Sequence, residues 1–206
     1  MSASSTPPLH PLIEAAAEGQ LPDWTEARNG RRKHMARVAQ LLRSWAEERG
    51  DLAREIGRWT AVGYLHDILR DADPEEIRPL VEPAFRDYPG GALHGPAAAQ
   101  RLREEGVEDE ELLKAITLHT LGSAEFGDLG MALFAADFLE PGRKFREKWR
   151  GDLRRRFPGD LQGVVRDVLA ARFRNQLDRG RPLREESVAF WNRITEGKGW
   201  ASASEL

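Results

Sequence analysis

Four of the five histidines in this 206-residue chain fall where the helical pattern turns toward the interior. His34 and His66 share helix faces with apolar residues, His119 ends such a face, and His94 comes just before a helix start. An apolar stripe covers about 100° of a helix, so four inward histidines are expected by chance in about 1% of cases. His10, in a proline-rich stretch, is expected to be exposed and to have no part in the site. The pattern predicts a shared chemical role for the other four.

Two aspartates follow the same pattern. Asp67 comes directly after His66, and Asp137 follows the apolar stretch from Leu129 to Ala136. Burying carboxylates and imidazoles costs several kcal/mol unless their charge and hydrogen bonds are compensated, and a divalent cation would satisfy all six groups. Taken singly, each residue has an ordinary explanation, such as a core histidine with one hydrogen bond or an aspartate in a buried ion pair. Together they favour a metal site.

The spacing of these residues is too wide for a local metal loop of the zinc-finger type. Five helices or helix ends must converge, which predicts a site in the interior or in a cleft of a helical bundle. Neighbouring side chains point about 100° apart on a helix, so Asp67 could bridge two metals beside His66. Mixed imidazole and carboxylate ligation suits iron, manganese, zinc, cobalt or nickel, and the sequence does not choose among them.

The elements that must position these residues are helices throughout, because strand-like alternation is absent. We expect one all-α domain, a single-domain helical bundle over residues 25–196, with a partly irregular segment 1–24 and a frayed tail 197–206. The expected helices cover residues 11–18, 25–49, 51–69, a short one from Asp73-Pro74, 95–105, 109–119, 129–140, 143–156, 160–179 and 183–195.

Composition excludes several classes of protein. The chain is 40% hydrophobic and 32% charged with a net charge of −3, which is typical of a soluble globular protein. It has no apolar run long enough for a membrane span and no basic, apolar leader, so we expect a cytoplasmic protein without membrane contact. The absence of cysteine excludes disulfides, thiolate metal sites and a cysteine nucleophile. P-loop, dinucleotide-binding, zinc-protease and serine-hydrolase motifs are absent from the sequence.

The segment 143–184 is strongly basic, with 14 Lys and Arg residues against 5 Asp and Glu residues. It could bind a polyanion, dock against the acidic remainder of the chain, or carry an ordinary solvated face. Trp149 and Phe157 lie among its arginines, as in a nucleic-acid-binding surface. However, Val164, Val168 and Leu169 form a core-facing stripe. That stripe favours an ordinary helical face over nucleic-acid binding.

The order of these residues resembles a known family. His34, the pair His66-Asp67, His94, His119 and Asp137 occur in the order typical of HD-domain metal-dependent phosphohydrolases. The strings HDILR, LHGPAAA, AITLHTLG and AADFLEPGR are similar to those of the bacterial YqeK-type proteins, which split diadenosine tetraphosphate symmetrically into two ADP. The resemblance runs from about Arg28 to Ile194. It implies an HD-type helical bundle and a hydrolase of phosphoric anhydrides.

The resemblance also implies roles for the residues. Two metal ions per chain are expected, iron first, with manganese, cobalt, nickel or zinc as alternatives. One ion would be bound by His34, His66, Asp67 and Asp137, and the second by Asp67, His94 and His119. A hydroxide shared by the two ions would attack phosphorus, with Asp67 and Arg70 as catalytic residues. The substrate-binding candidates are Arg70, Thr120, Gly122 and Arg143.

Three functions remain open at this point. The first is hydrolysis of a dinucleoside polyphosphate. The second is an HD hydrolase for another nucleotide or phosphate ester, because Arg70 stands where the family commonly has lysine and Leu121 interrupts its usual HTTG string. The third is a nucleic-acid or regulatory binding module with a structural metal, although nucleic acid is the weaker partner. A homodimer is compatible with all three.

Overall fold

The computed structural model describes residues 8–51 and 53–196, and within them the chain is helical without a β-strand. The α-helices are α1 (Pro11–Ala17), α2 (Asn29–Arg49), α3 (Ala53–Leu65), α4 (Pro74–Ile77), α5 (His94–Glu104), α6 (Glu110–Leu118), α7 (Asp128–Leu139), α8 (Glu147–Arg156), α9 (Leu161–Asp178) and α10 (Glu185–Thr195). Short 3-10 turns occur at Arg78–Leu80, Pro83–Phe85, Gly90–Ala92 and Phe157–Gly159. The prediction of an all-α bundle is confirmed. None of the described helices is both long and apolar enough to cross a membrane.

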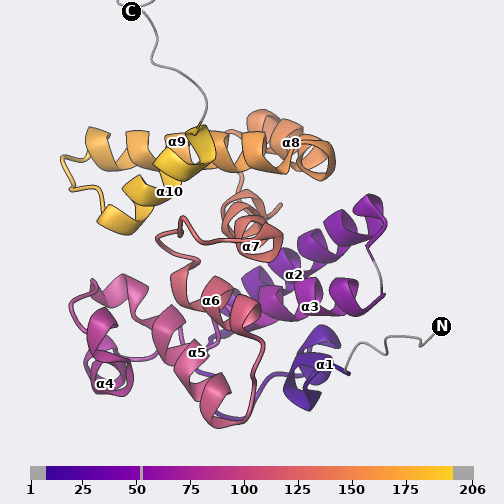
Figure 1. The fold of residues 1–206 in the computed structure, drawn as a ribbon, viewed down its shortest axis with the longest axis vertical. Helices are drawn as coiled ribbons and strands as arrows, with labels where there is room; N and C mark the ends of the chain where they lie inside the picture. The colour runs from indigo at the N-terminus through magenta and orange to yellow at the C-terminus, as the bar shows by residue number, and fades with distance from the viewer. Residues whose placement is uncertain (1–7, 52, 197–206) are drawn as a thin grey trace, which may run out of the picture.

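Helix α7 lies in the middle of the molecule. Every residue from Leu129 to Ala136 is buried, and a helix that is apolar on all sides must be covered on all sides. Figure 1 shows α7 between the layer of α8, α9 and α10 and the larger group that contains α2, α3, α5 and α6. The polar residues Asp137 and Glu140 come at the C-terminal end of this helix. The fold therefore brings two carboxylates to one point of the core.

Two glycines allow the close helix contacts that hold the histidines. A Cβ atom on Gly63 of α3 would lie 2.5 Å from the Cα atom of Ala39 in α2. A Cβ atom on Gly95 of α5 would lie 2.6 Å from the carbonyl oxygen of Ile116 in α6. Neither distance is compatible with a side chain, so α2 packs on α3 and α5 on α6 at backbone contact. These are the helices that carry or adjoin the four inward histidines.

Several predicted helix ends are confirmed. Gly50 ends α2 in the left-handed conformation, with φ of 75°. Asp73 accepts a hydrogen bond from the backbone N–H of Glu75 at the start of α4, and Asp109 does so from Leu112 at the start of α6. These residues cap the helices as their types predict.

Three predicted boundaries are wrong by four residues each. Helix α8 begins at Glu147 instead of residue 143. The other two errors have one cause. Helix α3 ends at Leu65 instead of Leu69, and α2 begins at Asn29 instead of Thr25. The backbone of Glu26 donates to the carbonyl oxygen of Ile68 at 2.8 Å and accepts from the N–H of Asp71 at 3.1 Å. These backbone hydrogen bonds join the segment before α2 to the segment after α3, and they replace the helical hydrogen bonds that either segment would otherwise make. His66 and Asp67 therefore lie in the turns that follow α3 rather than on a helix.

The prediction that His10 is exposed is also wrong. His10 is half-buried, and its Nδ1 accepts a hydrogen bond from the N–H of Leu12, so it caps α1. A histidine ahead of Pro11 can serve as such a cap because its ring nitrogen lies close to the first free N–H groups of the helix. The prediction of a frayed tail concerns residues 197–206, which lie outside the described residues. The domain limits stay a prediction.

Much of the basic segment is paired within itself. Arg154 contacts Glu147 at 2.7 Å, and Arg156 contacts Asp167 at 2.5 Å. Val164, Val168 and Leu169 of α9 are buried, as the apolar stripe predicts. The segment is therefore part of the core packing, and its α9 helix contacts the central helix α7.

Candidate metal centre

Asp67 lies at the centre of the histidine cluster, and its two carboxylate oxygens face different histidines. Its Oδ1 atom lies 2.9 Å from Nε2 of His94 and 3.5 Å from Nε2 of His119. Its Oδ2 atom lies 3.4 Å from Nε2 of His66 and 3.6 Å from Nε2 of His34. All five side chains are buried. The chain thus presents two groups of possible metal-ligand atoms, and the carboxylate of Asp67 belongs to both.

The elements around the cluster orient each ring. His66 donates from Nδ1 to the carbonyl oxygen of Gly63 at 2.9 Å, and His119 donates from Nδ1 to that of Ile116 at 2.7 Å. His34, on α2, donates from Nδ1 to Oε1 of Glu140 at 3.3 Å. In each case Nδ1 is engaged by an oxygen acceptor, and Nε2 faces Asp67. Metal-binding histidines are oriented in this way.

Asp137 closes the cluster from the end of α7. Its Oδ1 atom lies 3.2 Å from Nε2 of His34 and accepts a hydrogen bond from Arg143 at 3.0 Å. Burial disfavours the charged form of Asp137, but the close imidazole of His34 and the nearby charges of His66 and Arg143 outweigh it. The pKa of Asp137 is therefore far below its usual value. This carboxylate is ionised at neutral pH.

The buried carboxylate of Asp67 and the surrounding imidazoles also shift one another's pKa values. Burial raises the pKa of Asp67, but the charge of His66 and the hydrogen bonds from the surrounding histidines hold that pKa well below the usual range. Burial disfavours protonation of His66, whereas the charge of Asp67 favours it and gives a raised pKa. Burial dominates at His94 and lowers its pKa to about 4, and the charges of His119 and Arg70 act in the same direction. His94 is therefore a neutral electron-pair donor at pH 7.

These residues fit a divalent metal. The Nε2 atoms of His34 and His66 are buried without a hydrogen-bond partner, although carboxylate oxygens lie close to them. The Nε2 atoms of His94 and His119 are 3.0 Å apart. Lone pairs that converge on one another and on carboxylates require positive charge between them. Among the described residues, two groups have donor atoms within 4.8 Å of one another and could each hold an ion, namely His34, His66 and Asp67, and Asp67, His94 and His119.

The family model described as HD domain matches residues 31–142, which is more than half of the chain. The chain belongs to the HD-domain family. All six predicted metal ligands lie within the matched region. The prediction of an HD-domain hydrolase is confirmed, and the assignment of each ligand stays a prediction.

Individual proteins that are similar to this chain agree with the family assignment. A protein of Halalkalibacterium halodurans named symmetrical bis(5'-nucleosyl)-tetraphosphatase is 30% identical over 156 residues, covering 70% of this chain and 81% of the relative. A protein of the same name from Staphylococcus aureus is 32% identical over 120 residues, covering 55% of this chain and 60% of the relative. A solved structure from Clostridium acetobutylicum, described as a predicted HD superfamily hydrolase involved in NAD metabolism, is 21% identical. It has a TM-score of 0.69 over 88% of this chain and 94% of that one, so it supports the fold.

Sequence reasoning missed three residues of this HD-domain site. Arg31 donates to Oδ2 of Asp67 at 2.7 Å, and Arg37 donates to Oε2 of Glu140 at 2.5 Å. Glu140 is 2% exposed and contacts His34. A signal was present, because Arg31 and Arg37 lie one helical turn on either side of His34, and Glu140 lies one turn after Asp137.

The four residues predicted to contact the substrate differ in their burial and in their partners. Thr120 is half-buried, with its hydroxyl 3.2 Å from Nε2 of His119. Arg70 is half-buried, and its side chain makes no hydrogen bond or ion pair with another described residue. Arg143 contacts Asp137 and is exposed. Gly122 is buried against the ring of Phe190, so packing with α10 explains its presence. A contact of Gly122 with substrate stays a prediction without structural support.

An arginine-lined cavity of about 350 Å³ opens beside the HD-domain site. His34 contributes to its wall, together with Glu140 and Asp71. The cationic side chains around it are Arg28, Arg31, Arg37 and Arg143. Such a concentration of guanidinium groups suits phosphate, which arginine binds through paired N–H donors.

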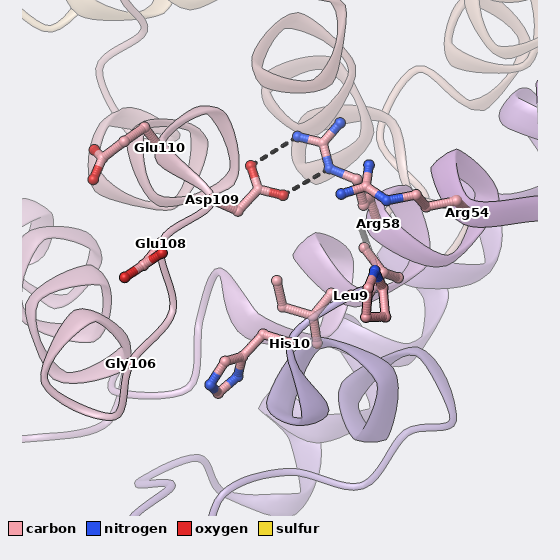
Figure 2. A pocket seen from close by; sticks show the side chains of 10 residues that line it. Leu9, His10, Arg54, Arg58, Gly106, Glu108, Asp109 and Glu110 are labelled. Atoms are coloured by element: carbon pink, nitrogen blue, oxygen red, sulfur yellow. Dashed lines mark hydrogen bonds and ion pairs between the residues drawn. The ribbon is translucent and has the colours of Figure 1, made fainter. Parts of the chain in front are cut away.

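A larger cavity of about 560 Å³ lies elsewhere, and none of the predicted site residues lines it. Figure 2 shows it between the start of α1, the side chains of α3 and the segment before α6. Two of its charged residues are paired, since Arg58 donates to Asp109 through two hydrogen bonds of 2.7 and 2.8 Å. Arg58 also contacts Glu55 and Glu111. This network joins α3 to α6 and has a structural role.

Proposed function

We propose that this HD-domain protein is a metal-dependent phosphohydrolase that cleaves diadenosine tetraphosphate into two ADP. The observation that carries the proposal is the convergence of four imidazoles on both oxygens of Asp67. The names of the relatives from H. halodurans and S. aureus support the choice of substrate. Relatives with named activity and a donor set suited to two cations point to the same chemistry.

The chain's own residues would hold two ions. His34, His66, Asp67 and Asp137 bind the first, and Asp67, His94 and His119 bind the second, with iron as the expected metal and manganese, cobalt, nickel or zinc as alternatives. Such a pair supplies a water nucleophile of lowered pKa and neutralises charge on the phosphoryl oxygens. Asp67 serves both ions because its low pKa keeps it ionised and its two oxygens face different histidines. The hydrogen bonds at Nδ1 keep the rings aligned.

The arginines would bind the phosphates that flank the scissile bond. A tetraphosphate brings several negative charges to a site that itself contains buried carboxylates, so cations beyond the metals are needed. The cavity beside His34 supplies Arg31, Arg37 and Arg143. Arg70, which makes no ion pair with a described residue, is free to take a phosphate oxygen. In this proposal a symmetric cut follows from cations on both sides of the reacting phosphorus.

The test is the product pattern from diadenosine tetraphosphate. Metal-loaded protein is expected to release mainly ADP, and Asp137→Ala is expected to be inactive. Asp128→Asn, at the opposite end of the same helix, is the matched control and should keep activity. Chromatography that finds ATP and AMP would show an asymmetric cut. No turnover of the tetraphosphate, with phosphate released from mononucleotides, would replace this proposal by an HD hydrolase for another phosphate ester.

A further inference from the structure

Another cavity, of about 380 Å³, adjoins the metal centre at Asp137. It lies between the end of α7, the start of α8 and the middle of α9. Its walls include Phe138, Phe145, Trp149, Arg172 and Gln176. Asp137 also lines it, and the same Asp137 faces His34 in the centre. A molecule in this cavity would therefore reach the reacting groups.

Phe145 is an exposed aromatic side chain that lines this cavity. It is 75% exposed, whereas most large apolar side chains of the described residues are covered. The backbone around it is fixed, because the buried Arg150 donates to the carbonyl oxygens of Phe145 and Phe138. Exposure of a phenyl ring costs free energy unless a ligand covers it, since the hydrophobic effect favours burial. Its ring is available for stacking.

The neighbouring residue carries backbone strain. Among the described residues, Arg146 is the one non-glycine residue with a positive φ, at 53°. This left-handed conformation is unfavourable for a residue with a Cβ atom, and such residues concentrate at functional sites. The guanidinium of Arg146 lies 4.5 Å from the centre of the Trp149 ring. A cation and two aromatic side chains, Arg146, Phe145 and Trp149, thus line one cavity.

The wall of the cavity also contains an unused hydrogen-bonding group. The Oε1 atom of Gln176 is buried and has no hydrogen-bond partner among the described residues. The adjacent amide of Asn175 already accepts a hydrogen bond from Arg179 at 3.1 Å. A glutamine amide pairs well with the edge of adenine, donating and accepting at once. Gln176 is therefore an amide in this wall whose acceptor oxygen is not used within the described residues.

The two cavities at the centre differ in chemistry. The one beside His34 is lined by arginines and has no aromatic side chain in its wall. The one beside Asp137 has three aromatic side chains and an unpaired amide. Arg143 lines both. This arrangement matches a ligand with phosphates at the centre and a base to one side.

We propose that the cavity beside Asp137 is the nucleoside subsite, in which one purine base stacks on Phe145 and Trp149 and is selected by Gln176. The identity of the substrate rests on the proposed function, whereas the location of the base does not. The phosphates extend past Arg143 toward the cavity beside His34. One nucleoside of a symmetrical substrate is then recognised through its base, and the other half is held through its phosphates.

The experiment measures binding of ADP and of inorganic pyrophosphate to metal-loaded protein by titration calorimetry. Phe145→Ala is expected to weaken ADP binding about tenfold, the size of one base-stacking contact. Pyrophosphate, which has no base, should bind equally to both proteins. Gln176→Leu should reduce the preference for ADP over UDP. Leu177→Ala is the control, because Leu177 is 62% exposed on α9 and does not line the cavity.

The outcomes separate this inference from the proposed function. Equal ADP affinity in Phe145→Ala and the unaltered protein would overturn the subsite, even if diadenosine tetraphosphate is hydrolysed. A tenfold loss of ADP affinity with unchanged pyrophosphate affinity supports the subsite, even if the tetraphosphate is not hydrolysed. An equal loss for ADP and pyrophosphate would also overturn it, because Phe145 would then affect phosphate binding alone. An unchanged melting temperature shows that each variant is folded.

Discussion

Glu140 lies behind His34, on the side of the imidazole ring opposite to Asp67. Its Oε1 atom is 3.3 Å from Nδ1 of His34, while Nε2 of the same ring faces Oδ2 of Asp67 at 3.6 Å. Burial disfavours the charged form of Glu140, but hydrogen bonds from Arg37, from the N–H of Gly142 and from His34 give a lowered pKa. An ionised carboxylate at this position makes His34 a stronger electron-pair donor.

Glu140→Gln is therefore expected to weaken metal binding although Glu140 is not a predicted ligand. The amide keeps an acceptor for Nδ1 of His34 but removes the negative charge, and loss of such a partner costs roughly 10-fold to 100-fold in metal affinity. Competition with a chelator of known affinity measures the change. The control is Glu47→Gln, because Glu47 is an exposed partner of Arg43 on the same helix as His34. Equal metal affinity in Glu140→Gln and the unaltered protein would contradict a role of Glu140 in metal binding.

The sequence predicted the helices and the inward histidines because both depend on local periodicity. His34 and His119 were placed by the apolar faces around them, and α7 by its uninterrupted apolar run. The end of α3 was wrong because the backbone of Glu26 pairs with Ile68 and Asp71, more than forty residues away in the chain. Contacts between residues so far apart in the chain leave no periodic pattern in the sequence.

The site was predicted less completely than the fold. Glu140 and Arg31 have the helical spacing that would have revealed them, but their types are common on exposed helix faces. Gly122 was expected at the pocket rim, yet its contact with Phe190 of α10 depends on how the C-terminal helices return to α7. The positive φ of Arg146 has no sequence signature, because arginine rarely adopts it. These features arise from tertiary packing.

The number of metal ions follows from the two oxygens of Asp67. Fully loaded protein is expected to contain two ions per chain, His94→Ala about one, and Asp67→Ala the least, because Asp67 faces both histidine pairs. Elemental analysis against protein concentration measures the content. A ratio that never exceeds one in the unaltered protein, and that is unchanged in His94→Ala, would rule out a dinuclear centre.

Asp109 contributes stability that depends on pH. Burial raises its pKa, but the hydrogen bonds from Arg58 and from the N–H of Leu112 hold the pKa below its ordinary value of 3.8. A carboxylate with a lowered folded-state pKa stabilises the protein fully above its unfolded pKa, and this stabilisation is lost as the pH falls through the folded pKa.

Asp109→Asn tests this directly, because asparagine keeps the helix cap and removes the charge. The free energy of unfolding is expected to fall by about 2 kcal/mol at pH 7, between the values for exposed and for buried ion pairs. Urea titrations of both proteins should show this difference shrinking below pH 4. A difference that is the same at pH 7 and at pH 3 would mean that the charge of Asp109 does not contribute.

Arg70 is expected to act on the substrate and not on the metal. Its side chain makes no ion pair with a described residue, although its backbone N–H donates to the carbonyl oxygen of Asp67 at 3.0 Å. Its charge contributes to the lowered pKa of His94, so it lies close to the centre. Arg70→Ala should therefore keep its metal content and melting temperature but lose about 2–3 kcal/mol of transition-state binding, the size of a charge-assisted contact to phosphate. This corresponds to a fall of roughly 30-fold to 150-fold in kcat/KM for diadenosine tetraphosphate. Arg174→Ala, an exposed arginine on α9, is the matched control. If Arg70→Ala loses metal together with activity, Arg70 instead helps to position the metal ligands. If kcat/KM is unchanged, Arg70 does not bind the substrate.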